Sequence, residues 1–332
     1  MKIGTMEIVR GQKNKGYILA GYCGDGAEIH IPVVSICGEE EGPVLWVNAG
    51  VHGEELSGIF AIHKIYEEVD PKKLKGTIIA SPGCNQLALR GSNKFTVEDQ
   101  LDMDQQFPGD PNGWLTQQMA YYFFEEVKKY TNYMIDLHAL GGMVAAPYTV
   151  FKSMDGIDEQ INIDARNMAL GFGASYNCYV NLSTATGELP GSVMGALDIQ
   201  CALHGIPCIM AELGSGNRVL WENVDLAKKG IINCLHYLKM LEGEVKTFHG
   251  QKIITKRKFP CTHRGGLVIP QVQAGCVAKA GTLIANVLNY VGDVVEEIRY
   301  DEDVCIFAVA ENPISSSGRI VAALGTEWEE IN

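Results

Sequence analysis

Hydrophobic positions along the first 240 residues follow two patterns, one typical of buried strands and one typical of amphipathic helices. The helical pattern predicts three helices. The strand predicted at 43–50 is too continuously apolar to have a solvent-exposed face. Helices that alternate with strands favour a mainly parallel or mixed sheet covered on both faces. The predicted strands are 28–36, 43–50, 76–83, 132–138 and 207–213, and the predicted helices are 54–69, 113–130 and 224–241.

The pattern changes after about residue 245. Short β-type runs such as GGLVIP, TLIANVL and DVCIFAVA are separated there by turns that contain glycine. This predicts a small all-β unit rather than a continuation of the α/β pattern. We therefore expect an α/β domain over residues 1–244 and a β-rich C-terminal domain over residues 245–332.

Composition and net charge limit the classes of molecule that the protein is expected to bind. The 332 residues are 46% hydrophobic and 20% charged, which is ordinary for a globular protein. A formal net charge of −13 argues against nucleic acid, because phosphate binding needs a surplus of Lys and Arg. No apolar run approaches the roughly 20 residues that span a bilayer, and the N-terminus lacks the apolar centre of a signal peptide. We therefore expect a cytoplasmic protein with neither a nucleic-acid nor a membrane partner.

Ten cysteines are scattered along the chain without a C-x-x-C pair. A chain of this length does not need disulfides to stabilise its core. We expect most of these cysteines to be reduced core thiols.

Side chains that can bind a metal follow three of the predicted strands. His52 and Glu55 come just after strand 43–50, His138 ends strand 132–138, and Glu212 ends strand 207–213. In an open α/β sheet, ligands bind beyond the carboxyl ends of the strands. Two histidines and one carboxylate form a zinc set that leaves a position for water, and a further glutamate can then act as general base. Asp136 lies on the same face of its strand as His138, where it can orient the imidazole.

Each motif has a simpler interpretation when taken alone. HGEE (52–55) also fits a solvated helix start, where glutamates suit the helix dipole. His138 alone also fits a core histidine with a hydrogen-bond partner. The metal-site hypothesis depends on the three strand ends together.

These residues resemble the succinylglutamate desuccinylase and aspartoacylase family of the zinc carboxypeptidase superfamily. The family pattern runs from H-G-x-E through a segment ending in D-L-N-R-x-F-P-G to D-L-H and E-L-G. The order and spacing fit over roughly residues 28–215, and the β-rich tail resembles the family's extra C-terminal domain. The matching segments here are HGEE (52–55), CNQLALRGSNKFTVEDQLDMDQQFPG (84–109), DLH (136–138) and ELG (212–214).

The resemblance implies a catalytic domain over residues 1–244 that hydrolyses an amide bond with one Zn²⁺ per chain. It implies that His52, Glu55 and His138 bind the zinc and that Glu212 activates the zinc-bound water. Glu54 falls at the variable position of the motif and is not expected to be a ligand. Lys94 stands where the family has an arginine that supports the oxyanion, and lysine supplies charge without the planar fork.

The chain departs from the family where the substrate is held. Asp104 and Gln105 replace the Asn-Arg pair that grips a substrate carboxylate. A carboxylate about 4 Å from Asp104 would be repelled by about 4 kcal/mol at an effective dielectric near 20, before screening. We therefore expect the substrate group near Asp104 and Gln105 to be neutral or cationic.

Other candidate substrate contacts are less specific. Arg90 and Arg218 can hold a carboxylate at a shifted location, or can form surface salt bridges. Tyr148 can line the pocket, or can simply pack in the core. His204 is expected to cap the preceding helix rather than to bind zinc.

The leading functional hypothesis is a zinc-dependent amide hydrolase that deacylates a small N-acylated amino acid or amine. A carboxypeptidase-type peptidase is the first alternative, although Gln105 replaces the carboxylate-gripping arginine. A non-catalytic binding protein of the same fold is the second. In each case the expected partner is a small molecule, and a homo-oligomer remains possible.

Overall fold

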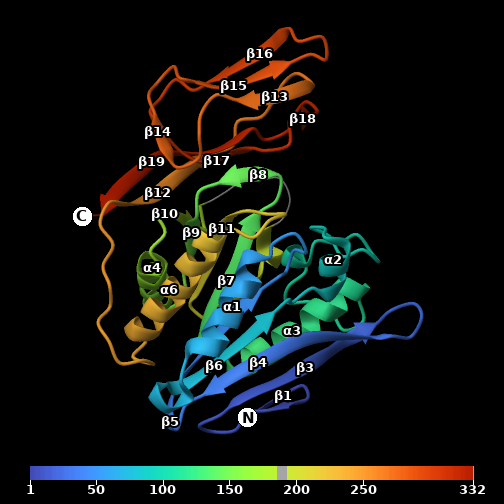
Figure 1. The fold of residues 1–332 in the computed structure, drawn as a ribbon, viewed down its shortest axis with the longest axis vertical. Coiled ribbons are helices and arrows are strands. Elements are labelled where there is room, and N and C mark those ends of the chain that lie inside the picture. Colours follow the sequence, from blue (N-terminus) through green and yellow to red (C-terminus); the bar gives the residue numbers. More distant parts are fainter. Residues whose placement is uncertain (185–192, 332) are drawn as a thin grey trace.

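A computed structural model describes residues 1–184 and 193–331, and its centre is a large mixed sheet (Figure 1). The strand order is β14-β17-β19-β12-β10-β9-β11-β7-β5-β6-β4-β3, with β8 paired to β17. β1 (Lys2–Ile3) and β2 (Met6–Glu7) form a separate ribbon. The strands that the N-terminal part contributes to the main sheet are β3 (Lys13–Tyr22), β4 (Glu28–Cys37), β5 (Glu40–Ala49), β6 (Lys75–Pro82), β7 (Tyr133–Leu140), β8 (Met143–Ala145), β9 (Tyr148–Ser153), β10 (Tyr176–Asn181) and β11 (Cys208–Ser215).

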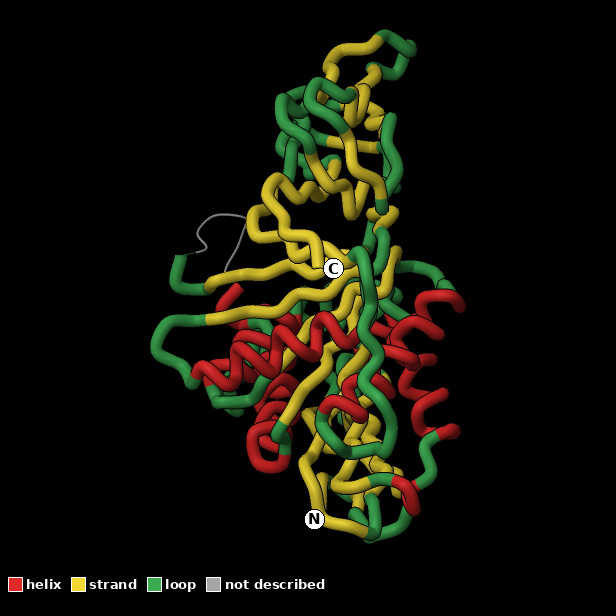
Figure 2. The backbone as a smooth tube through the Cα atoms, turned by 90° about the vertical axis from the view of Figure 1, so that its left-hand side faces the viewer, coloured by secondary structure: helices red, strands yellow, loops and turns green. Residues whose placement is uncertain are grey.

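Helices cover both faces of this part of the sheet (Figure 2). One hydrophobic core joins α1, α4 and α6 to the sheet, and a second joins α2, α3 and α5 to the opposite face. Side chains alternate between the two cores along β5, so that Val47 lies in the first and Trp46 in the second. The helices are α1 (Ser57–Glu68), α2 (Gln86–Gly91), α3 (Leu115–Tyr130), α4 (Glu159–Phe172), α5 (Leu197–Leu203) and α6 (Trp221–Tyr237), with 3₁₀ turns η1 (Pro71–Lys73), η2 (Met103–Gln105) and η3 (Val193–Gly195).

The C-terminal part is built from strands and continues the main sheet. β12 pairs in parallel with β10, and β19, β17 and β14 follow in order. A second, antiparallel sheet of order β16-β15-β13-β18 extends away from the helices (Figure 1). The strands are β12 (Gln251–Lys258), β13 (Gly266–Pro270), β14 (Cys276–Ala278), β15 (Leu283–Leu288), β16 (Val294–Arg299), β17 (Val304–Ala310), β18 (Ile314–Ser315) and β19 (Ala322–Ile331).

The predicted fold class is confirmed: a mixed α/β sheet with helices on both faces and an additional β-rich C-terminal part. The division into domains at residue 244 stays a prediction. All three predicted helices have bounds that differ from those expected, and α3 begins at Leu115. α1 begins at Ser57 because residues 52–55 form a turn, and α6 runs from Trp221 to Tyr237.

Three parallel neighbours at the centre of the sheet position the candidate site. β7 lies between β5 and β11 and runs parallel to both. Their carboxyl ends therefore meet at one edge of the sheet, as predicted for ligand binding in α/β folds. In the described part of the chain, no helix has both the length and the apolar character needed to cross a membrane.

Candidate metal centre

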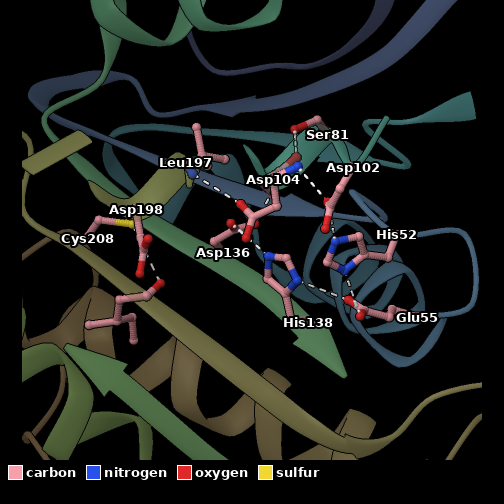
Figure 3. A network of polar contacts seen from close by, with 12 residues as sticks. His52, Glu55, Ser81, Asp102, Asp104, Asp136, His138, Leu197, Asp198 and Cys208 are labelled. Atoms are coloured by element: carbon pink, nitrogen blue, oxygen red, sulfur yellow. Dashed lines mark hydrogen bonds and ion pairs between the residues drawn. The ribbon is translucent and has the colours of Figure 1, made fainter. Parts of the chain in front are cut away.

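Two histidines and a glutamate converge at the carboxyl ends of β5 and β7 (Figure 3). His52 and Glu55 lie in the turn after β5, and His138 lies in β7. Nδ1 of His52 is 2.8 Å from Glu55 Oε1, and Nδ1 of His138 is 3.0 Å from Glu55 Oε2. All three side chains are buried, and one ligand atom from each lies within 4.8 Å of the others. The structure thus brings together the three residues predicted to bind zinc.

Buried carboxylates hold the opposite nitrogen of each imidazole. Nε2 of His52 is 3.0 Å from Asp102 Oδ1, and Nε2 of His138 is 3.0 Å from Asp136 Oδ2. Asn48 donates a hydrogen bond of 2.8 Å to the other oxygen of Asp136. A carboxylate on Nε2 fixes the tautomer and ring orientation that leave Nδ1 for a metal.

The donor set fits a divalent cation. Nδ1 of His52 and Nδ1 of His138 both face the carboxylate of Glu55. Oε2 of Glu55 is buried and has no aligned hydrogen-bond donor among the described residues, although His138 lies at ion-pair distance. A buried carboxylate oxygen in that state is costly unless a cation or a proton compensates it. Two imidazoles and one carboxylate also match the ligand types of catalytic zinc sites.

Charges in the cluster shift each pKa strongly. Burial alone would lower the pKa of His52, but Glu55 and Asp102 outweigh it and raise this pKa to about 10. Burial also opposes the shift at His138, where Asp136 and Glu55 raise the pKa. Burial would raise the pKa of Glu55, but the two histidines lower it to about 2. Without a bound cation, the carboxylates of the cluster therefore favour the protonated form of both imidazoles.

Glu212 lies beside the cluster on β11. It stands directly opposite His138 in the β11–β7 pairing, and its Oε2 is buried without a hydrogen-bond partner among the described residues. Burial, reinforced by the charge of Glu55, raises the pKa of Glu212 to about 7. A carboxyl with this pKa can accept and release a proton near neutral pH.

Lys94 reaches the same edge from the loop after α2. Its Nζ is 3.3 Å from Asp102 Oδ2, so that Asp102 bridges Lys94 and His52. The lysine side chain is 46% exposed. Burial opposes the shift, but Asp102 raises the pKa of Lys94 and keeps it charged.

Asp104 and Gln105, where the family pattern changes, both lie on η2. Asp104 Oδ1 accepts the backbone N–H of Leu197 at 3.1 Å, and Asp104 also forms a second group of possible cation ligands with Asp136 and His138. Burial, with a further contribution from Asp136, raises the pKa of Asp104 to about 6. Gln105 is exposed.

The other candidate substrate contacts are exposed or interact with other side chains. Tyr148 is opposite Glu212 in the β11–β9 pairing, but its ring packs edge-on against Phe307 at 5.0 Å between centroids. Arg90 is exposed at the end of α2, and its substrate contact stays a prediction. Arg218 forms an ion pair with Glu311 of the C-terminal part.

His204 lies away from the cluster, and its Nδ1 is 2.8 Å from the carbonyl oxygen of Gln200, which fits the predicted helix cap.

Asp102 was not singled out from the sequence. It lies far from His52 along the chain, in a loop without a periodic pattern. The one available signal was its place in the segment DMDQQ, where it also caps η2 by accepting the N–H of Asp104 at 3.0 Å. A carboxylate in a motif segment, beside a suspected metal-binding histidine, is the kind of residue that holds a ligand in place.

Comparisons with known proteins agree with this geometry. Residues 41–238 match the succinylglutamate desuccinylase/aspartoacylase catalytic domain. The chain is 25% identical over 277 residues to the N-alpha-acetyl-L-2,4-diaminobutyric acid deacetylase of Halomonas elongata, a match that covers 82% of this chain and 78% of that protein.

Solved structures share the fold. The product-bound ectoine utilization protein EutE (DoeB) from Ruegeria pomeroyi superposes with a TM-score of 0.86 at 22% identity, over 98% of this chain and 100% of that one. The succinylglutamate desuccinylase/aspartoacylase from Rhodobacter sphaeroides gives a TM-score of 0.82 at 23% identity, over 96% of each chain. Because the catalytic-domain match covers more than half of the sequence, the chain belongs to the succinylglutamate desuccinylase/aspartoacylase family.

Proposed function

We propose that the chain is a zinc-dependent deacylase that hydrolyses the amide bond of a small N-acylated amino acid or amine. The observation that carries this proposal is the convergence of His52 Nδ1 and His138 Nδ1 on Glu55, with each Nε2 held by a buried carboxylate. The deacetylase from Halomonas elongata, named for an acylated amino acid, supports the choice of reaction.

The residues divide into binding and proton-transfer roles. His52, Glu55 and His138 would hold the zinc, which when bound polarises the substrate carbonyl and lowers the pKa of water toward neutrality. Glu212 accepts a proton from the attacking water and returns it to the leaving amine. Lys94 supplies positive charge toward the oxygen on which negative charge develops.

Replacing Glu212 by glutamine tests its role as the base. Glu212→Gln keeps the shape of the side chain but cannot take up the proton, so kcat should fall by about 10²-fold to 10⁴-fold. Its zinc content should stay at the wild-type level. Glu222→Gln, an exposed glutamate on α6, is the matched control and should leave kcat unchanged. A Glu212→Gln enzyme with wild-type turnover would remove Glu212 from this role.

We also propose that the substrate carries a neutral or cationic group near Asp104, and that an N-acetylated diamino acid fits best. Asp104 takes the place of a neutral asparagine, and it lies next to the buried carboxylate of Asp136 without a neutralising arginine at position 105. An ammonium group there would gain from both charges, and it would lower the pKa of Asp104 and keep it ionised. The Halomonas relative is named for a substrate with such a side-chain amine.

The test compares two substrates that differ only in the amine. Wild-type enzyme should prefer N-α-acetyl-2,4-diaminobutyrate to N-acetyl-2-aminobutyrate in kcat/KM. Asp104→Asn should reduce this preference by about tenfold to hundredfold, the range for a hydrogen bond to a charged group. It should change kcat/KM for the amine-free substrate far less.

The double variant Asp104→Asn/Gln105→Arg should shift the substrate preference toward N-acetylaspartate. An unchanged preference in Asp104→Asn would refute the cationic-group proposal while leaving the deacylase proposal standing. Short peptides in the same panel test the peptidase alternative.

A further inference from the structure

Glu54 lies where three loops meet beside the candidate metal centre. The loop after β5 carries His52 and Glu55, the loop at 141–142 follows the strand of His138, and the loop that begins at Gly216 follows the strand of Glu212. The backbone oxygen of Glu54 accepts the N–H of Asn217 at 2.7 Å. The first and third loops are therefore joined directly at Glu54.

The side chain of Glu54 makes the second connection. Its Oε2 accepts a hydrogen bond of 3.4 Å from Asn217 Nδ2, and its carboxyl group lies against Gly141. A Cβ atom at Gly141 would be 1.6 Å from Glu54 Oε1 and 2.5 Å from Cδ. The backbone φ of Gly141 is not positive, so the space that a side chain would need at this position is limited by the carboxyl group of Glu54 and not by backbone strain.

The third connection joins the end of β7 to the loop after β11 and does not involve Glu54. The N–H of Gly216 donates to the carbonyl oxygen of Leu140 at 2.8 Å. Within residues 1–184 and 193–331, the Glu54 carboxylate forms no ion pair, and it does not belong to either group of possible metal ligands. Its contacts are thus with the loops themselves rather than with a charged partner.

We propose that Glu54 is a positioning residue, which holds the loops after β7 and β11 against the turn that carries the candidate ligands His52 and Glu55. The turn at 52–55 supplies two of the three candidate ligands and β7 supplies the third, so the distances between the ligand atoms depend on where this turn lies against the loops that follow β7 and β11. A carboxyl group packed on Gly141 and bonded to Asn217 limits their separation. This inference rests on the proposed zinc site.

The test measures the zinc dissociation constant by competition with a chromophoric chelator, together with kcat/KM. Glu54→Ala should weaken zinc binding by about tenfold, the lower end of the range for residues that support metal ligands. Glu54→Gln should recover most of that loss, because its amide oxygen can still accept from Asn217 while its amide nitrogen lies on Gly141. Glu67→Ala, an exposed glutamate on α1, should bind zinc as the wild type does.

Gly141→Ala provides an independent way to remove the same contact. The new methyl group would displace the flexible end of Glu54, so this variant should lose as much zinc affinity as Glu54→Ala. Since both changes remove one interaction, the double variant should be no weaker than either single variant. Losses that multiply in the double variant would overturn the inference.

Two further outcomes separate this inference from the proposed function. Tight zinc binding by the wild type that is unchanged in both Glu54→Ala and Gly141→Ala would overturn the positioning role alone. A wild type without zinc affinity would overturn the proposed function and the positioning role together.

Discussion

At the scale of single residues, the candidate site is a cluster of buried charges that compensate one another. Glu55, Asp102 and Asp136 surround two imidazoles, and each imidazole contacts two carboxylates. Burying that many charges is costly unless each is paired. A divalent cation that replaces the two imidazole protons would keep the same balance of charge.

Zinc binding should therefore release protons. The pKa of His52 is raised to about 10 and that of His138 is also raised, so the neighbouring carboxylates favour the protonated form of both imidazoles when no metal is bound. Zinc needs both in the neutral form, so binding should release about two protons and strengthen as pH rises from 6 to 8. Calorimetry in buffers of different ionisation enthalpy measures this number.

Asp102→Asn tests whether the neighbouring carboxylates determine the number of protons that zinc binding releases. An amide in place of the carboxylate removes one cause of the raised pKa of His52, so fewer protons should be released at pH 8. Zinc affinity should fall by about 10-fold to 100-fold. Zinc binding without proton release at pH 7 would contradict this description of the cluster.

The sequence predicted these residues unevenly. His52, His138 and Glu212 follow or end apolar strands, and polar side chains at such positions stand out against the hydrophobic pattern. Asp102 and Glu54 do not stand out, because both lie in irregular segments that already contain other acids. Their contacts depend on the path of loops, which no local pattern specifies.

At the scale of elements, the turn between β5 and α1 is the part of the site most constrained by its backbone. Gly53 donates its N–H to the carbonyl oxygen of Asn93 at 2.8 Å. A Cβ atom at Gly53 would lie 1.9 Å from the carbonyl oxygen of Ala88 and 2.1 Å from its carbon. These are backbone atoms, so the turn carrying His52 packs directly on α2 and the segment that follows it.

Gly53→Ala should force these two segments apart. We expect a loss of about 1–3 kcal/mol in the free energy of unfolding, the usual cost of overpacking. Zinc affinity should weaken too, because the turn supplies two of the candidate ligands. Gly24→Ala is the control, since its Cβ would have open space and its φ is not positive. Equal urea midpoints for the two variants would contradict the expectation.

Elements with strong patterns were predicted well, and elements with mixed patterns were not. The strands at the centre of the sheet are apolar on both faces, and β5, β7 and β11 could be located for that reason. β3 and β10 contain lysine, glycine or asparagine between their apolar residues, and they were not assigned. Their strand conformation depends on neighbouring strands rather than on their own composition.

At the scale of the whole molecule, the C-terminal part is attached to the catalytic part by more than a linker. β12 extends the main sheet beyond β10, and Glu311 donates its N–H to Gly142 at 3.0 Å, in the loop after the strand of His138. Glu311 also pairs with Arg218 after the strand of Glu212. The sequence predicted the change to β structure near residue 245, but it contained no signal for this shared sheet.

The shared sheet predicts cooperative unfolding. Hydrogen exchange at increasing urea should show β10 and β17 losing protection at the same concentration, because the sheet runs from one to the other through β12 and β19. Loss of protection in β17 at clearly lower urea would instead indicate that the tail unfolds as a separate domain.

The metal content of the purified protein tests the central claim most directly. Zinc-loaded wild type, after removal of free metal, should contain about one zinc per chain, and His52→Ala and His138→Ala should each lose it while remaining folded. His63→Ala, an exposed histidine on α1, should retain the metal. Full zinc occupancy in both ligand variants would contradict the assignment of the site.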